Sequence, residues 1–421
     1  MWKVGRALTV TFAVAVLAAG SVFYGLVYLL DFQEIDNTKK LDAKTLFDLV
    51  KLSFGVVAGA GALVALVVAY RRQRVDEAGA HREATRLHTE RFSQAVDKLG
   101  SDSPAVRLGG VHALAGLADD APDDNLRQTC IDVLCAYLQL PFTPDPGDDP
   151  AHQEEHHRYL AFRKVRHTIL GLISDHYRHP QGAPRSWQGC DLDLTGVTID
   201  CRMDFSRVVF FSGRVSFAGA LFSDGGRVSF ADAVFSGGRV SFADASFSDG
   251  GRVSFAAAVF SGGEVSFADA EFSGGRTSFD AVTFANGGRV SFDGVTFSGG
   301  RVSFGGAEFS GGSVSFEAAG FSGGTVPFRR STFSGSTVSF NGALFDGGAV
   351  SFAHTTFSRG RVSFDSATFS GDGVTFPLVR FFGGQVSFSE ATGQAPSELV
   401  PAVITVSAPV VVPSAWLPVN P

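Results

Sequence analysis

The chain is short of the residues on which most enzymes and metal proteins depend. It has 421 residues and four cysteines, which make no C-x-x-C pair: Cys130, Cys135, Cys190 and Cys201. Neither a zinc site nor a disulfide framework is indicated, and we expect reduced thiols. No serine lies in a Ser-His-Asp setting, and "SGGR" lacks the G-K-[ST] ending of a phosphate loop. The sequence therefore predicts a protein that is not an enzyme, with no catalytic, cofactor-binding or metal-binding residue.

An excess of positive charge is also missing. The net charge is -7, whereas a nucleic-acid-binding domain is usually basic. From residue 202 to residue 392 there are 14 arginines, no lysine and 16 acidic residues, a net charge of -2. These numbers argue against nucleic acid as a partner.

Charge is absent altogether from two apolar stretches near the N-terminus, 7–30 and 52–70. About 20 apolar residues span a bilayer, so residues 1–70 predict a transmembrane hairpin that contacts membrane lipid. A signal peptide is the alternative for the first stretch. Arginines directly after the second stretch favour a multi-pass cell-membrane protein with its N-terminus and repeats in the cytoplasm. Gly55 and Gly59 form a G-x-x-x-G face, on which the two helices would pack or a homodimer would form.

Residues 71–187 predict a helical neck. Ser103-Pro104 is a helix start, and a second helix opens at Asp123 or Asp124, which together give a HEAT-like hairpin. The Pro- and Asp-rich segment 141–150 reads as a linker before a third helix over about 151–177. Histidine and glutamate at 152–157 are the one cluster that suggests chemistry, although the spacing differs from H-E-x-x-H. A solvated helix end is the simpler interpretation, and a metal-dependent enzyme is the alternative.

Phenylalanine sets the pattern of the second half of the chain. From Phe217 to Phe388 the gaps between phenylalanines alternate between five and seven, or five and eight, which gives a twelve-residue unit, "VSFADAVFSGGR". In the longer gaps the extra residue, Asp224, Asp249 or Asn286, lies beside the glycines. Insertions are tolerated in loops, so the glycines predict a corner that accepts a positive φ.

Within a unit the residues alternate with period two, which is typical of strands. Val228 and Phe230 would share an inward face, and so would Ala233 and Phe235. Each buried phenylalanine contributes about 2–3 kcal/mol, enough to hold a stack without a globular core. The predicted core ladder includes these residues: Phe230, Phe235, Phe242, Phe247, Phe255, Phe260, Phe267 and Phe272.

"VSFAD" and "AVFSG" resemble the repeating units of pentapeptide-repeat proteins, over roughly residues 190 to 390. The resemblance implies a right-handed quadrilateral β-helix with four pentapeptides in each coil. Here a two-residue spacer follows every second pentapeptide, so over 188–392 we expect each coil of the solenoid to take about 24 residues. A flat coil of twelve residues is the alternative. Residues 90–122 also resemble the helical segment of membrane-anchored members in actinobacteria. The Pro-rich residues 393–421 read as a cap or tail, extended over 399–417.

The repeats also place arginines in rows on the surface. The candidate surface ladder is Arg227, Arg252, Arg276 and Arg301. We expect a non-catalytic, membrane-tethered platform that binds a protein partner the sequence does not identify. Some pentapeptide-repeat proteins bind DNA gyrase by imitating DNA, so a binder or protector of a DNA topoisomerase is the alternative. A DNA mimic should be acidic along its length, and these repeats are nearly neutral.

Overall fold

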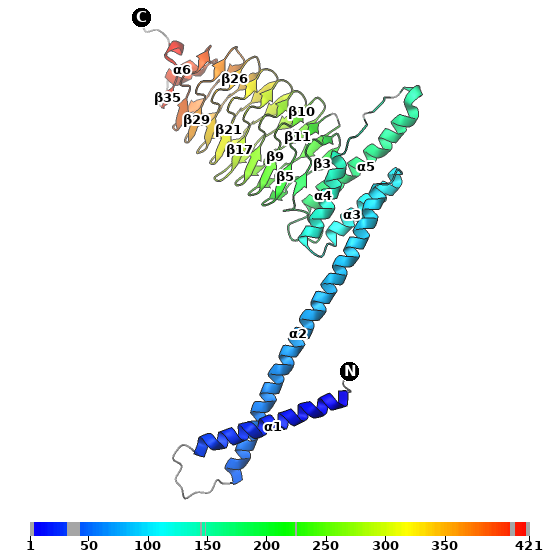
Figure 1. Cartoon of the computed structure of the whole chain (residues 1–421). Helices are drawn as coiled ribbons and strands as arrows, with labels where there is room; N and C mark the ends of the chain where they lie inside the picture. The colour runs from blue at the N-terminus through cyan, green and yellow to red at the C-terminus, as the bar shows by residue number, and fades with distance from the viewer. Residues whose placement is uncertain are drawn as a thin grey trace. The chain divides into compact units, whose positions relative to one another are not determined.

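The computed structural model describes residues 4–31, 43–143, 145–147, 149–223, 225–404 and 409–417. The chain divides into two compact units, Met1–Leu87 and His88–Pro421, and the boundary falls inside a helix. The first unit holds α1 (Val4–Asp31) and most of α2 (Ala43–Leu99). Both helices are shown in blue in Figure 1.

The predicted transmembrane hairpin is not found. Over the described residues, no helix combines the length and the hydropathy that crossing a bilayer requires. The second predicted span is not a separate element, because it is the first part of α2, which continues through charged residues as far as Leu99. The multi-pass localisation predicted from these stretches is therefore wrong, and the predicted contact with membrane lipid has no support in the described residues.

The second unit begins with a layer of helices. They are α3 (Pro104–Asp119), α4 (Asp124–Gln139), the short η1 (Pro150–His152) and α5 (Gln153–Arg178). Asp123 caps α4 by accepting a hydrogen bond from the backbone N–H of Leu126. The end of α2 packs closely on α3 at Gly110, where a Cβ would lie 2.6 Å from the backbone nitrogen of Leu99. Glycine is required at this crossing.

The rest of the unit is a parallel β-solenoid with four sheets, shown in Figure 1. Sheet A contains β1 (Leu192–Asp193), β5 (Arg214–Ser216), β9 (Arg239–Ser241), β13 (Glu264–Ser266), β17 (Arg289–Ser291), β21 (Ser313–Ser315), β25 (Thr337–Ser339), β29 (Arg361–Ser363), β33 (Gln385–Ser387) and β35 (Val410–Val411). Sheet B contains β2 (Thr198–Ile199), β6 (Leu221–Phe222), β10 (Ser246–Phe247), β14 (Glu271–Phe272), β18 (Thr296–Phe297), β22 (Gly320–Phe321), β26 (Leu344–Phe345), β30 (Thr368–Phe369) and β34 (Thr392–Gly393).

The other two sheets alternate with these around each coil. Sheet C contains β3 (Arg202–Asp204), β7 (Arg227–Ser229), β11 (Arg252–Ser254), β15 (Arg276–Ser278), β19 (Arg301–Ser303), β23 (Thr325–Pro327), β27 (Ala349–Ser351) and β31 (Val374–Thr375). Sheet D contains β4 (Val209–Phe210), β8 (Val234–Phe235), β12 (Val259–Phe260), β16 (Thr283–Phe284), β20 (Glu308–Phe309), β24 (Thr332–Phe333), β28 (Thr356–Phe357) and β32 (Arg380–Phe381). Because successive strands go to sheets C, D, A and B in turn, sheets A and C form opposite sides.

The strand register gives the coil length. Arg252 lies opposite Arg227 in one neighbouring strand of sheet C and opposite Arg276 in the other. Each of these steps covers two of the twelve-residue units, and the first also contains the inserted Asp249. The predicted coil of two units is therefore confirmed, and the flat coil of one unit is wrong.

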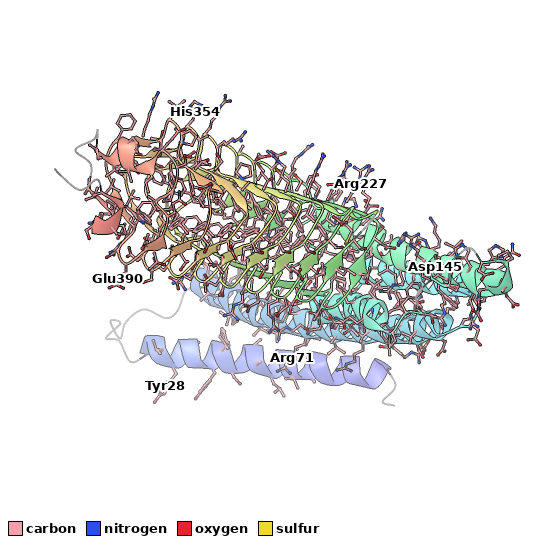
Figure 2. All side chains as sticks on the ribbon, turned by 90° about the horizontal axis from the view of Figure 1, so that it is seen from above. Tyr28, Arg71, Asp145, Arg227, His354 and Glu390 are labelled. Carbon is pink, nitrogen blue, oxygen red and sulfur yellow. The ribbon has the colours of Figure 1, made fainter. Side chains whose placement is uncertain are left out.

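Phenylalanine rings fill the interior in four stacks, one beside each sheet. Figure 2 draws the side chains of the rod as sticks. Phe230 and Phe255 lie parallel, 4.8 Å between centroids and 5° between planes, and Phe242 and Phe267 repeat this geometry. Rings of the stacks beside sheets C and A meet edge to face. Phe230 and Phe242 are an example, with 90° between their ring planes. Both arrangements are favoured for aromatic pairs. All eight phenylalanines of the predicted ladder are buried.

Two kinds of corner turn the chain. At each glycine corner one residue has a positive φ. Where the corner contains an inserted residue, that conformation belongs to the glycine, Gly250 or Gly287, and not to the preceding Asp249 or Asn286. The second corner was not predicted from the sequence. There the second residue after the phenylalanine has a positive φ, as at Asp232 (56°) and even Ala257 (56°).

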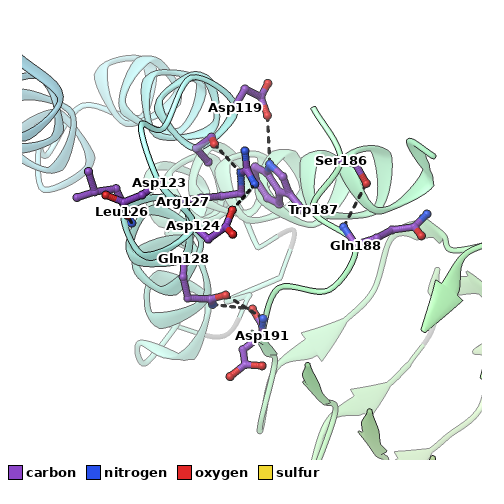
Figure 3. A network of polar contacts seen from close by, with 11 residues as sticks. Asp119, Asp123, Asp124, Leu126, Arg127, Gln128, Ser186, Trp187, Gln188 and Asp191 are labelled. Atoms are coloured by element: carbon purple, nitrogen blue, oxygen red, sulfur yellow. Dashed lines mark hydrogen bonds and ion pairs between the residues drawn. The ribbon is translucent and has the colours of Figure 1, made fainter. Parts of the chain in front are cut away.

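Both ends of the solenoid are covered. At the first coil, Gln128 of α4 exchanges two 2.8 Å hydrogen bonds with the backbone of Asp191, and the Nε1–H of Trp187 donates to Asp119 (Figure 3). At the last coil, α6 (Leu399–Ile404) and η2 (Ser414–Trp416) replace the extended tail expected there. Trp416 donates to the carbonyl of Gly393 and packs edge-on against Phe388.

Candidate binding face on sheet C

Sheet C carries a continuous row of arginines. Each is the first residue of its strand, and the pairing register places each directly opposite the next: Arg202, Arg227, Arg252, Arg276 and Arg301. Neighbouring strands are about 4.8 Å apart, so the five arginines leave the backbone at that interval along the rod. We call these five residues the arginine row. Thr325 occupies the next position and ends it.

The row is set by the alternation of side chains along a strand. In β7, Val228 points into the core and is buried, so Arg227 before it must point outward. The same order, an exposed arginine followed by a buried residue, repeats in β11, β15 and β19. Figure 2 shows Arg227 projecting from one edge of the rod, with His354 farther along that edge and Glu390 on the opposite edge.

Four members of the row have no ion-pair partner among the described residues, although Asp280 lines a depression together with Arg276 and Arg301. Among the described residues, the side chains of Arg227, Arg252, Arg276 and Arg301 make no hydrogen bond and no ion pair within 4.0 Å. Arg202 alone is paired, with Asp204 at 3.7 Å. Like charges at facing positions of a sheet repel one another, so this arrangement costs stability rather than adding to it.

Sheet A, on the opposite side, has the same repeat but a different charge pattern. Arg239 pairs with Glu264 at 3.7 Å, and Arg214 pairs with Asp191 at 3.6 Å. Beyond Arg289 the equivalent positions are Ser313 and Thr337. The sequence repeat alone therefore does not force a row of unpaired arginines, and the two sheets differ mainly in this respect.

Shallow depressions lie between the arginines of sheet C. One of about 390 Å³ is lined by four of the row's arginines and by Met203 and Val228, and another of about 400 Å³ lies between Arg276 and Arg301. The serines of these strands serve the fold, because the hydroxyls of Ser229 and Ser254 accept hydrogen bonds from backbone N–H groups two residues later. The face therefore presents exposed arginine side chains, and the serines between them mainly stabilise the fold.

The histidine and glutamate cluster at 152–157 does not form a metal site. In the described part of the chain, no group of three His, Cys, Asp or Glu side chains is placed to hold an ion. His156 instead contacts Asp145 of the linker, with 2.6 Å between Nδ1 and Oδ1. The hydrogen bond from His156 lowers the pKa of Asp145.

The four cysteines are free and poorly suited to chemistry. Burial raises the pKa of Cys130 and of Cys190 to about 11, and that of Cys135 and of Cys201 to about 12. Thiols of this kind are protonated at neutral pH, and the thiolate is the reactive form.

Arg202 was missed as a member of the row because the first coil departs from the repeat. "CRMDF" has methionine where the later coils have valine, so the pentapeptide unit is hard to recognise there. The signal available was the equal spacing of Arg202, Arg227 and Arg252 along the chain, which the strand register reproduces.

Comparisons with known proteins add little. No protein-family model matches the chain, and no curated protein does. Among solved structures, the chain is similar to a trypsin-treated variant of QnrB1, described as a plasmid-mediated fluoroquinolone resistance protein. The identity is 14%, the match covers 51% of this chain and 90% of that one, and the TM-score is 0.19. At this TM-score the likeness does not indicate a function for the chain.

Proposed function

We propose that the protein is a non-catalytic scaffold whose arginine row binds an acidic partner protein. The observation that supports this is the series of four exposed, unpaired guanidinium groups in register on sheet C. An acidic surface lying along the row would relieve the mutual repulsion of these charges and form hydrogen bonds with each guanidinium. Because the strands are held by the phenylalanine stacks, the cations are already in place before a partner arrives.

The test compares two variants with the same change in charge. The first replaces Arg227, Arg252, Arg276 and Arg301 on sheet C with glutamine. The second replaces Arg214, Arg239, Arg289 and Arg361, which occupy the same strand position on sheet A. Binding of a polyglutamate peptide to each full-length protein is measured at low and moderate salt. Exposed charge pairs are individually weak, and four together give a loss of about tenfold or more in the sheet C variant.

The sheet A variant should bind the peptide nearly as well as the unmodified protein. Equal losses in the two variants would mean that net charge alone attracts the peptide, and the arginine row would have no special role. A duplex DNA of matched charge serves as a second ligand. If it bound more tightly than the peptide through the same arginines, a protein partner would no longer be supported.

A second candidate keeps the same scaffold and specifies the partner as a DNA topoisomerase. The observation that favours it is the four-sheet parallel solenoid, the architecture that the pentapeptide resemblance implies for proteins that bind gyrase. Mimicry of DNA is disfavoured by the arginine row, so contact would use another mode. A gyrase supercoiling assay with the full chain tests this candidate, and unchanged activity at saturating protein would remove it.

A further inference from the structure

A hollow of the second unit lies among the helices and shares no lining residue with the arginine row. Its volume is about 570 Å³, within the range of small-molecule sites. The lining comes from α3, α4, the linker and α5. Aromatic rings form much of the wall: Tyr137, Phe142, Tyr159 and Phe162. Phe142 and Tyr159 lie 5.1 Å apart between centroids, which makes a continuous aromatic surface.

Three arginines line the same cavity. Arg107 lies over the ring of Phe162 at 4.6 Å, Arg158 lies over the same ring at 5.8 Å, and Arg166 lies over Phe142 at 4.9 Å. Arg107 also donates a 3.0 Å hydrogen bond to the hydroxyl of Tyr137. Among the described residues of the lining, Glu155 is the one carboxylate, so these residues carry a net charge of about +2.

Arg166 is the distinctive group. Its side chain is half-buried, and among the described residues it makes no hydrogen bond and no ion pair. A buried charge is normally paired because removing it from water is costly. Burial lowers the pKa of Arg166, and an anion beside the guanidinium would oppose that shift. The guanidinium carbon lies over the Phe142 ring, and no described residue accepts a hydrogen bond from the N–H donors of Arg166.

We propose that this cavity binds a small phosphorylated aromatic compound. A phosphate monoester carries a charge of about -1.5 to -2 at neutral pH, which matches the net charge of the lining. Arg166 and Arg158 donate to the phosphate oxygens in the forked geometry that guanidinium and phosphate share. The planar ring of the ligand packs against Tyr159 and Phe142. This site is separate from the arginine row and does not depend on it.

The test measures calorimetric binding of 1-naphthyl phosphate and of AMP to the full-length protein. Inorganic phosphate and the neutral counterparts 1-naphthol and adenosine are measured beside them. At least one ester should bind saturably and about tenfold more tightly than both its neutral counterpart and inorganic phosphate, because only the ester satisfies both parts of the site. No saturable binding of either ester at millimolar concentration, or equal binding of phosphate or the neutral ring, would overturn the proposal.

Variants locate the binding within the cavity. Arg166→Met keeps the aliphatic packing and removes the charge, and it should weaken ester binding by about tenfold or more. Lys164→Gln changes the charge equally at an exposed position of α5 outside the lining, and it should leave the affinity unchanged. Arg158→Gln, at an exposed position of the rim, gives the same test if Arg166→Met does not fold. Ester binding that is indifferent to loss of these guanidiniums would contradict the assignment.

Discussion

At the scale of single residues, the second corner of each half-coil imposes an unusual backbone conformation. The residue two positions after the core phenylalanine is in the left-handed region, and glycine or aspartate fills many of these positions. Ala257, Ala281 and Ala318 also adopt it, with φ of 55–56°. The conformation is unfavourable for an alanine by about 1–2 kcal/mol, since its Cβ approaches the next carbonyl oxygen and it has no polar side chain to compensate. The phenylalanine stacks hold these residues in place.

Replacing Ala281 with glycine should therefore stabilise the rod by about 0.5–1 kcal/mol, after the greater freedom of glycine in the unfolded chain is counted. Gly306→Ala is the matched control. It occupies the same corner at φ 66°, and no atom lies within 4 Å of the added Cβ, so its cost comes from the backbone alone. Amide hydrogen exchange in the affected coil measures both changes. Destabilisation by Ala281→Gly would show that the corner is not strained.

This corner could not be read from the sequence because the residue types there point in different directions. Aspartate at 232 and glycine at 219 are compatible with a positive φ, whereas alanine at 257 and leucine at 378 give no such indication. Gly238 and its equivalents lie beside a second glycine, and that doubled pattern identified the other corner at once.

At the scale of elements, one partly buried carboxylate connects α5 to the first coil. Asp200, between β2 and β3, accepts a 2.6 Å hydrogen bond from the Nε–H of Arg163 and lies 2.7 Å from the Nε2 of His167. Burial by itself would raise the pKa of Asp200, but the hydrogen bonds from His167 and Arg163 lower it to about 2. The helix and the solenoid are thus joined by a contact that requires an ionised carboxylate.

This contact makes the stability dependent on pH. The pKa of an aspartate in an unfolded chain is about 3.9, so the contribution is complete above about pH 4 and disappears as the pH falls toward 2. Asp200→Asn should cost about 1–2 kcal/mol at neutral pH and almost nothing near pH 2. Thermal melts of both proteins across this range measure the difference. Asp175→Asn, at an exposed position of α5, should show no such convergence.

The helical layer was predictable in part. Ser103-Pro104 and Asp123 are local signals, and α3 and α4 begin directly after Ser103 and Asp123. The side chains that attach the layer to the solenoid were not predictable, because their partners are distant in sequence. Asp119 contacts Trp187 and Gln128 contacts Asp191, and neither residue belongs to a motif. The cavity beside Arg166 could not be predicted from the sequence for the same reason.

At the scale of the whole molecule, the repeat determines the rod. Phenylalanine spacings of five and seven predicted the strands, the glycine corner and a coil of two units, whereas the second corner was not predicted and the coil length needed the strand register to decide it. The row of four arginines was predicted, but the sequence could not show that among the described residues these form no ion pair while Arg214 and Arg239 of sheet A do. Hydropathy counted along the chain was misleading for residues 52–70, which belong to one long helix.

The caps at the rod's ends should govern whether it self-associates. β35 pairs with β33 in sheet A, and Trp416 packs on both Phe369 and Phe388. A variant lacking residues 394–421 would leave parallel strand edges and the final phenylalanines open, and such edges pair with other chains. We expect concentration-dependent, end-to-end oligomers by light scattering. Trp416→Ala should show a weaker form of the same behaviour, and a truncated variant that scatters like the full chain would contradict this role.

The placement of the aromatic residues has an optical consequence. The coils contain phenylalanine but no tyrosine or tryptophan between Trp187 and Trp416, which lie at opposite ends of the solenoid. In a Trp2→Phe background, which removes the third tryptophan of the chain, emission excited selectively from tryptophan therefore comes from the two ends of the solenoid and does not report on its centre. With Trp187→Phe or Trp416→Phe, the remaining end of the solenoid can be followed separately. Fraying that starts at one terminus and propagates inward would appear as two distinct fluorescence transitions, without any added dye.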